Sequence, residues 1–387
     1  MTENQLNNMR KPDAKKWNPK QLIPIAIFLI VGFAGGFCIG LLLDDLTGLY
    51  QGLPFPLPLV ITMVYLFIAI YAQLILHEAG HLVCGLASGY RFSSFRVGSL
   101  MLFKDGDRLK FKTLSIAGTG GQCLMLPPQS DDGRAPFQLY FLGGALANFV
   151  TSAVFALLYV VTPHTSFLSP LLSALAIIGL TIGLMNAIPL RLAMLDNDGN
   201  TLRSLKKDPQ AVLAFFQMMQ IHGRIAAGDR LKDMPEDWFQ TPVSANTTNA
   251  LIATIEVYRC NRLLDEQNYA ETAESIRALF ASTAAIAGIH RGLLVCDLAY
   301  CALMMGQESE ATALLDAQQL KFMKSMKRFP GVLRTQYAVA ILRDQDAEQA
   351  ASIQTAFDRM AVRYPYASDI ASEQELMCAA LKKSIEP

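Results

Sequence analysis

The sequence predicts a mainly α-helical polytopic membrane protein with about four transmembrane helices and a cytoplasmic β-hairpin, followed by a soluble α-helical C-terminal domain. Three observations predict this fold class. The first half of the chain holds long apolar segments, an alternating apolar–polar stretch separates two of them, and a helical pattern recurs after residue 247. The 387 residues are 52% hydrophobic and 17% charged, which is more apolar than an ordinary soluble domain.

Four segments are apolar enough to form membrane-spanning helices, each of which needs about 20 residues. The second segment is longer than that, so its far end should emerge at the membrane surface. No small-residue cleavage site clearly follows the first, so an uncleaved anchor is favoured over a signal peptide. The four segments are Leu22–Leu43, Leu59–Ala87, Phe137–Val161 and Phe167–Ile188.

Lysine and arginine alternate across these segments. The N-terminal tail carries five, the loop Asp44–Pro58 none, the loop Ser88–Pro136 seven, and the loop Thr162–Ser166 none. Cytoplasmic loops are enriched in these residues. We therefore expect a multi-pass integral membrane protein, of a bacterial cell membrane, with both termini and the long loop in the cytoplasm.

The long loop contains "SFRVGSLMLFKDGDRLKFKTLSI", in which apolar and polar residues alternate on both sides of Asp105-Gly106. Such alternation around an Asp-Gly pair predicts a β-hairpin. The following segment Gly118–Pro128, "GTGGQCLMLPP", is interpreted as a glycine-rich loop. It lacks the Lys-Ser/Thr ending of a phosphate-binding loop.

Beyond residue 247 a similar pattern occurs three times, beginning at Leu263, Leu303 and Ile341. Each copy indicates a helix, a turn and an alanine-rich helix, so the region resembles tetratricopeptide repeats with a longer period and a loose consensus. An irregular helical bundle is the alternative. The chain therefore divides into a cytoplasmic tail (1–21), a membrane-embedded core (22–202), a helix and connector (203–247), and a cytoplasmic helical-repeat domain (248–387).

The second apolar segment contains "LILHEAGHLV", with three ionisable residues in a helix that should sit in lipid. Ionisable groups inside a membrane are costly and usually functional. Because residues four apart share a helix face, His77 and His81 can bind one metal ion. Glu78 can then reach a metal-bound water without ligating the metal, and act as its general base.

A catalytic zinc site needs a third protein ligand. His164 falls on the opposite side of the membrane, His222 and His290 lie in the soluble region, and no glutamate occurs between Glu78 and Glu236. An aspartate is therefore expected. Asp196 and Asp198 both lie where the fourth apolar segment returns to the level of the two histidines.

The "HEAGH" motif on a membrane helix, followed by "NAIPLRLAMLDNDGN" (Asn186–Asn200), resembles the site-2 protease family of intramembrane zinc metallopeptidases. The resemblance implies Zn²⁺ as cofactor. It also implies that the aspartate of an Asp-Gly pair is the third ligand, which favours Asp198, followed by Gly199, over Asp196. The stretch between Pro189 and Asp198 is longer than in the commonest family form.

The same resemblance suggests residues that bind substrate. "GGALANF" (Gly143–Phe149) is similar to a glycine-rich family segment ending in asparagine, which implies that Asn148 binds the substrate backbone. Helix packing by small residues, with Asn148 bonded to a neighbour, is the alternative. Asn186 matches the start of the Asn-x-x-Pro family stretch and is assigned to substrate binding on that ground.

The predicted function is that of an intramembrane zinc metalloprotease, which hydrolyses membrane-spanning or membrane-associated substrates near the cytoplasmic leaflet. An unwound substrate strand would add to the edge of the hairpin around Asp105-Gly106. The alternatives are a catalytically lapsed, membrane-anchored repeat scaffold that binds partner proteins, and a transporter, which four helices without a related second half disfavour. Expected partners are a membrane protein or peptide substrate, the lipid bilayer and a protein that binds the repeats. A net charge of zero argues against nucleic acid.

Overall fold

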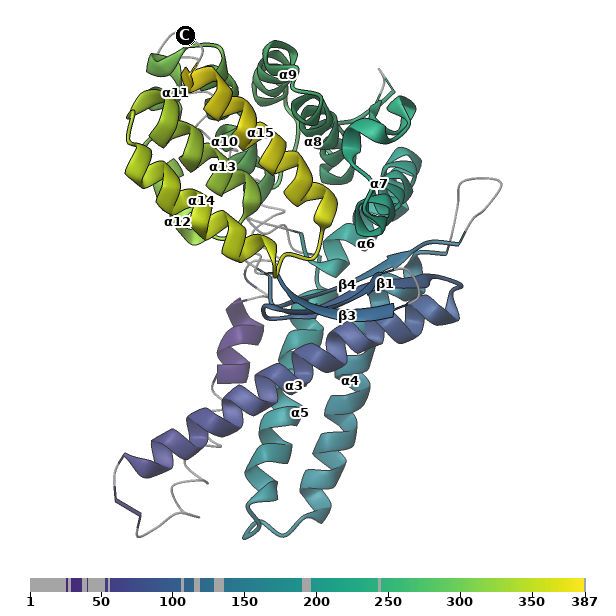
Figure 1. The fold of residues 1–387 in the computed structure, drawn as a ribbon. Helices are drawn as coiled ribbons and strands as arrows, with labels where there is room; N and C mark the ends of the chain where they lie inside the picture. Colours follow the sequence, from purple (N-terminus) through teal and green to yellow (C-terminus); the bar gives the residue numbers. More distant parts are fainter. Residues whose placement is uncertain are drawn as a thin grey trace.

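The computed structural model describes residues 26, 29–36, 40, 53–54, 56–105, 108–114, 119–128, 136–189, 196–242 and 245–385. These residues form three tiers (Figure 1). Long apolar helices occupy one end, a small β-sheet crosses above them, and a helical domain covers the sheet. The mainly helical class expected from the sequence is confirmed.

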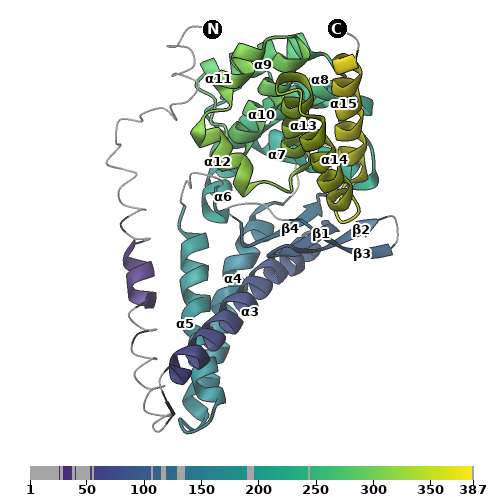
Figure 2. The same cartoon turned by 60° about the vertical axis from the view of Figure 1, so that its left-hand side comes forward.

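The apolar tier consists of α3 (Leu57–Ala87), α4 (Gln138–Val161) and α5 (Leu168–Ala187), each long and apolar enough to cross a membrane. The 31 residues of α3 span about 46 Å at 1.5 Å per residue, which exceeds the roughly 30 Å of a bilayer core. α3 runs obliquely past α4 and α5 and reaches the sheet with its C-terminal end (Figure 2). The first predicted span, Leu22–Leu43, lies largely outside the described residues, although residues 29–36 are helical.

The sheet has the strand order β3-β2-β1-β4, and all its pairs are antiparallel. Its strands are β1 (Arg91–Val97), β2 (Leu100–Asp105), β3 (Arg108–Thr113) and β4 (Gly121–Leu126). The predicted hairpin is present as β2 and β3, in which Asp105 pairs with Arg108. Gly106 lies outside the described residues.

Two sequence-based expectations about this region are wrong. The stretch before Asp105 is not one strand, because a turn at Gly98, with a φ of 59°, separates β1 from β2. The segment Gly118–Pro128 is not a loop throughout, because β4 occupies its second half. Cys123 and Met125 of β4 are buried in alternation, so period-two burial prevails over the glycines at the start of the segment.

The helical domain is built largely of helix pairs. The turns within three of these pairs have a left-handed residue at intervals of 39 residues, at Gln267, Gly306 and Gln345. They join α8 (Ala250–Asp265) to α9 (Tyr269–Ala281), α10 (Gly288–Met304) to α11 (Glu308–Leu314), and α13 (Pro330–Ala338), with its π-helical extension η3 (Val339–Arg343), to α14 (Ala347–Ala361). These pairs lie at the three predicted repeats, but α12 intervenes between the second and third. The other helices after α5 are α6 (Asp198–Lys207), α7 (Pro209–Ala227), α12 (Ala317–Ser325) and α15 (Ala367–Ile385), with the 3₁₀ helices η1 (Leu231–Asp233) and η2 (Glu236–Phe239).

The helical domain packs on the sheet directly. Met101 and Phe103 of β2 are buried in one cluster with Tyr364. The amide of Thr113 on β3 donates to the carbonyl of Arg363 at 3.1 Å. Because α3 contacts β1 and β4 from the other side, the sheet lies between the apolar helices and the helical domain (Figure 1).

Candidate metal centre

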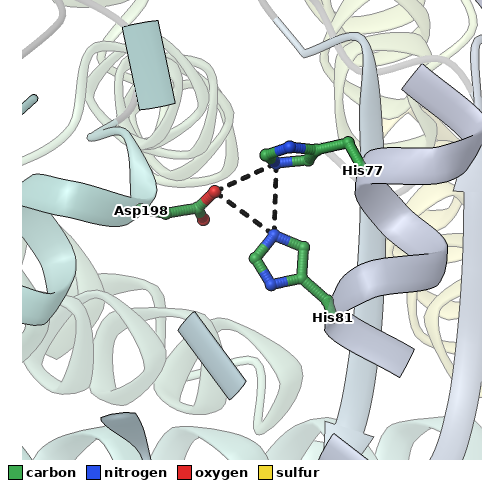
Figure 3. A group of neighbouring side chains, drawn as sticks. All are labelled: His77, His81 and Asp198. Atoms are coloured by element: carbon green, nitrogen blue, oxygen red, sulfur yellow. Dashed lines mark hydrogen bonds and ion pairs between the residues drawn. The ribbon is translucent and has the colours of Figure 1, made fainter. Parts of the chain in front are cut away.

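His77 and His81 project from the same face of α3, as their spacing predicts. Their Nε2 atoms are 3.2 Å apart, and both side chains are buried. Asp198 approaches them from α6, with its Oδ2 atom 3.1 Å from Nε2 of His77 and 3.2 Å from Nε2 of His81. Three potential ligands therefore meet at one point, although Asp198 lies more than a hundred residues after the two histidines in sequence (Figure 3).

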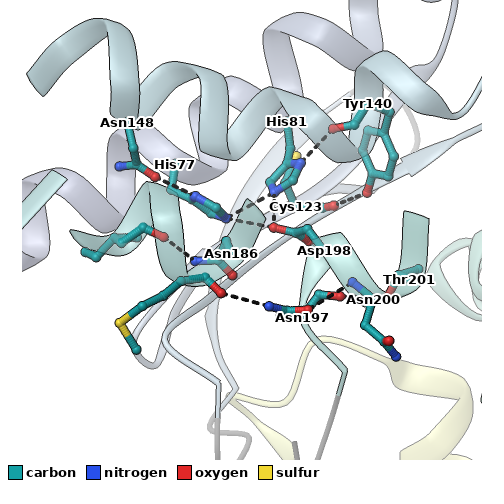
Figure 4. Close-up of polar contacts among 12 residues, drawn as sticks. His77, His81, Cys123, Tyr140, Asn148, Asn186, Asn197, Asp198, Asn200 and Thr201 are labelled. Atoms are coloured by element: carbon teal, nitrogen blue, oxygen red, sulfur yellow. Dashed lines mark hydrogen bonds and ion pairs between the residues drawn. The ribbon is translucent and has the colours of Figure 1, made fainter. Parts of the chain in front are cut away.

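Each histidine is oriented through its other ring nitrogen. Nδ1 of His77 donates to Oδ1 of Asn148 at 2.7 Å, and Nδ1 of His81 donates to the carbonyl of Tyr140 at 2.7 Å (Figure 4). With a proton on each Nδ1, both Nε2 atoms present lone pairs toward one another and toward Asp198. Three acceptor atoms that converge in this way repel one another unless a cation lies between them.

The donor set fits zinc. Two imidazole nitrogens and one carboxylate oxygen are common zinc ligands, and a catalytic site keeps a fourth position open. Bond lengths of about 2.0–2.1 Å give a tetrahedron with edges of about 3.3 Å, close to the 3.1–3.2 Å between the three ligand atoms. Outer hydrogen bonds like those from Asn148 and Tyr140 are typical of metal-binding histidines.

Asn197 holds Asp198 in place. Its side-chain oxygen accepts from the amide of Asn200 at 2.9 Å and so caps the N-terminus of α6. Its side-chain amide donates to the carbonyls of Met185 and Ile188 at the end of α5. One buried asparagine thus fixes both the start of α6 and its distance from α5, as Figure 4 shows.

Glycines allow α3, α4 and the ligands to approach closely. A Cβ atom on Gly144 of α4 would lie 2.5 Å from Nε2 of His81 and 2.6 Å from Nε2 of His77. A Cβ atom on Gly80 would lie 2.2 Å from the carbonyl oxygen of Gly143. The "GGALANF" segment therefore lets both imidazoles lie directly against α4.

Glu78 lies next to the metal ligands and against the sheet. Its side chain is buried and lines the same cavity as His77, His81 and Asp198. A Cβ atom on Gly121 would lie 2.3 Å from Oε1 of Glu78, so only glycine fits at this end of β4. The carboxylate makes no hydrogen bond to a described residue, which leaves it available to a water molecule.

Asp198 is ionised at neutral pH. Burial alone would raise the pKa of Asp198, but without a metal ion the charge of a protonated His81 and hydrogen bonds from His77 and His81 hold it well below its ordinary value, and a bound cation would replace those protons in the same role. The carboxylate is the form that ligates a metal. Asp198 therefore contributes a negative charge to the centre.

The structure brings together His77, His81 and Asp198, with Glu78 beside them, as the sequence predicts. Asp196 lines the cavity but is not part of the ligand cluster. Asn148 is fully buried and uses both ends of its amide, because its nitrogen donates to the carbonyl and to Oε1 of Gln73. Because both ends of its amide are already engaged, Asn148 is better suited to orienting His77 than to contacting substrate.

Asn186, the other predicted substrate-binding residue, lines the cavity near Asp198. Its side-chain amide donates to the carbonyl of Ile182 in its own helix at 3.0 Å. Sequence reasoning missed Gln73 and Asn197. Both carry a recognisable signal, since Gln73 lies one helical repeat before His77 on the same face, and an asparagine is a preferred helix N-cap.

Comparison with known proteins supports the same assignment. No curated protein and no solved structure matches the chain. Residues 65–173 match the model of peptidase family M50, a segment that includes His77, Glu78, His81 and Asn148 but ends before Asp198. The matched family is the site-2 protease family that the motifs of this chain resemble, so the match over residues 65–173 agrees with that resemblance.

Proposed function

We propose that this protein is an intramembrane zinc metalloprotease that hydrolyses peptide bonds of membrane-spanning or membrane-associated substrates. The observation that carries the proposal is the convergence of Nε2 of His77, Nε2 of His81 and Oδ2 of Asp198 within 3.2 Å of one another. Glu78 lies on the same cavity wall. The protein would work at the cytoplasmic leaflet, because the Lys/Arg distribution favours that side for the end of α3.

His77, His81 and Asp198 would hold the zinc ion, which when bound polarises a peptide carbonyl and makes water a stronger acid. Glu78 would then accept a proton from the attacking water and deliver it to the amide nitrogen of the scissile bond. The C–N bond breaks, and the products are a carboxylate and an amine. Asn148 and the carbonyl of Tyr140 keep Nδ1 of each histidine protonated and so keep Nε2 available to the metal.

Substrate would bind along β4, not along the β2–β3 hairpin that the sequence favoured. β4 is an edge strand, and its first residue, Gly121, abuts Glu78. The opposite edge strand, β3, already bonds to Arg363 of the helical domain through Thr113. An unwound substrate strand added to β4 would therefore pass the metal ligands with its backbone extended.

The test compares cleavage and metal content in matched variants of the full chain. Glu78→Gln should abolish cleavage of membrane-protein substrates while stoichiometric zinc is retained. Asp198→Ala should lose both zinc and cleavage, and Asp196→Ala should keep its zinc. If Glu78→Gln leaves the pattern of membrane-protein fragments in cells unchanged, the protein is not a protease of this kind.

A further inference from the structure

The cavity at the candidate metal centre continues into the helical domain. It has a volume of about 1940 Å³, with His77, Glu78 and Asp198 at one end and Asp297, Asp369 and Glu373 at the other. Pockets for small ligands usually measure about 300–1,000 Å³. The additional space can hold a polypeptide segment that extends away from the scissile bond. We call the part within the helical domain the inner arm.

Acidic groups on the inner arm outnumber the cations that pair with them. The fully buried Arg334 is shared by Asp297, at 2.5 Å, and Glu373, at 3.3 Å. Asp369 accepts a hydrogen bond from the hydroxyl of Tyr364 at 3.2 Å and has no cationic partner among the described residues. Burial raises the pKa of both Asp369 and Glu373 to about 7, as expected where a carboxylate has too little opposing charge.

The basic side chains on the wall of the inner arm do not remove this imbalance. Arg230 pairs with Asp265, at 2.5 Å, and with Glu375. The guanidinium of Arg291 lies over the ring of Phe280, 4.9 Å from its centroid. Neither has a described ion pair with Asp369 or Glu373.

One polar atom on the same wall independently indicates a ligand. Nδ1 of His290 is buried and has no hydrogen-bond partner among the described residues. Burial lowers the pKa of His290 to about 4, so the ring is neutral and can accept a hydrogen bond. Buried polar groups nearly always have a partner, and a donor-rich cation would supply one to this nitrogen.

Resting on the protease function proposed above, we propose that the inner arm binds the lysine- and arginine-rich cytoplasmic segment of the substrate. Membrane-spanning proteins carry these residues at the cytoplasmic end of a span, and the scissile bond would lie at that end. A basic segment leaving the metal centre along the cavity would reach Asp369 and Glu373. The helical domain thus selects substrates by the charge of their cytoplasmic flank.

The test measures binding of a fluorescein-labelled arginine-rich peptide to the full chain by fluorescence anisotropy. The measurement is made at about pH 8, where both carboxylates are ionised. The peptide should bind saturably, and the same peptide with glutamate at each arginine should not. Asp369→Asn and Glu373→Gln should each weaken binding about tenfold. Glu348→Gln, at an exposed position of α14, is the matched control and should leave binding unchanged.

Several results would overturn the proposal: equal binding of the two peptides, no saturable binding, or an equal loss in Glu348→Gln. Asp369→Asn keeps the test valid if other variants misfold, because removal of its charge leaves no cation unpaired. Peptide binding does not require cleavage. Binding without proteolysis would refute only the proposed function, whereas proteolysis without charge-selective binding would refute only the role of the inner arm.

Discussion

Oδ1 of Asn148 accepts a hydrogen bond of 2.7 Å from Nδ1 of His77, so a residue of α4 sets the direction in which a residue of α3 presents its other ring nitrogen. Gln73 holds the far end of the same asparagine through its carbonyl and Oε1 atoms. The centre is thus supported by a buried polar chain inside an apolar bundle.

Replacement of Asn148 by alanine should therefore weaken zinc binding. Loss of an outer-shell partner typically lowers metal affinity by about 10- to 100-fold, and we expect that range when the chain is titrated against a zinc chelator. Ser152→Ala, one turn further along α4, is the control. If zinc affinity stays constant while KM rises, Asn148 contacts substrate instead.

Gly144→Ala should displace the two imidazoles. The added methyl group would lie about 2.5 Å from both rings, closer than van der Waals contact permits, so α3 and α4 must separate. We expect zinc content to fall well below one ion per chain by metal analysis. Gly36→Ala serves as control, since a Cβ atom there meets nothing within 4 Å. Equal loss of zinc in both variants would indicate a general effect on the bundle.

Arg96 provides a test of how β4 is held next to Glu78. Its guanidinium is almost fully buried and donates to the carbonyl of Gly98 at 2.7 Å, to Oγ1 of Thr119 at 2.5 Å and to the carbonyl of Gly121 at 3.4 Å. Arg96→Met should lower kcat by about tenfold or more with zinc retained, because Gly121 would shift relative to Glu78. Added guanidinium should restore part of the activity. A rise in KM alone, with no rescue, would contradict this role.

The parts of this architecture that could be predicted from sequence are those determined by local periodicity. His77 and His81 share a face because an α-helix repeats every 3.6 residues, and the long apolar helices follow from composition and length. The distance from Asp198 to the histidines depends on how α5 ends and α6 begins. Only the general position of Asp198 could be inferred, and the resemblance to a family was needed to prefer it over Asp196.

β4 was missed for a different physical reason. Glycines in a sequence predict a loop when they supply backbone freedom, but Gly121 is required because Glu78 occupies the space of its side chain. That requirement depends on a contact between residues 43 positions apart in the chain. The cavity in the helical domain is likewise lined by residues from many helices, and no local pattern indicates it.

Two substitutions of Asn197 should separate its two roles, which are to cap the N-terminus of α6 and to tie α6 to the end of α5. Loss of the helix cap costs about 1 kcal/mol, and loss of the bonds to Met185 and Ile188 frees Asp198 to move. Asn197→Ala should therefore bind zinc more weakly, whereas Asn197→Asp should keep the cap but not the bonds to α5. If both variants bind zinc like the parent chain, Asn197 does not position Asp198.

The stability of the helical domain should depend on Asp369 in a pH-dependent way. Its pKa is raised to about 7 by burial, above the ordinary value, so the folded state holds this proton more tightly than the unfolded state. The stabilising contribution of protonated Asp369 is complete below about pH 4 and is lost as the pH rises toward 7. An asparagine side chain is neutral at every pH and so resembles the protonated carboxyl group of Asp369. The free energy of unfolding of Asp369→Asn should therefore match that of the parent chain at about pH 4 and exceed it at about pH 8, by up to about 4 kcal/mol. Thermal denaturation of both chains in the same detergent measures the difference. If the difference in free energy of unfolding between the two chains stays constant across this pH range, Asp369 has an ordinary pKa. The inner arm then holds less uncompensated negative charge than its geometry indicates.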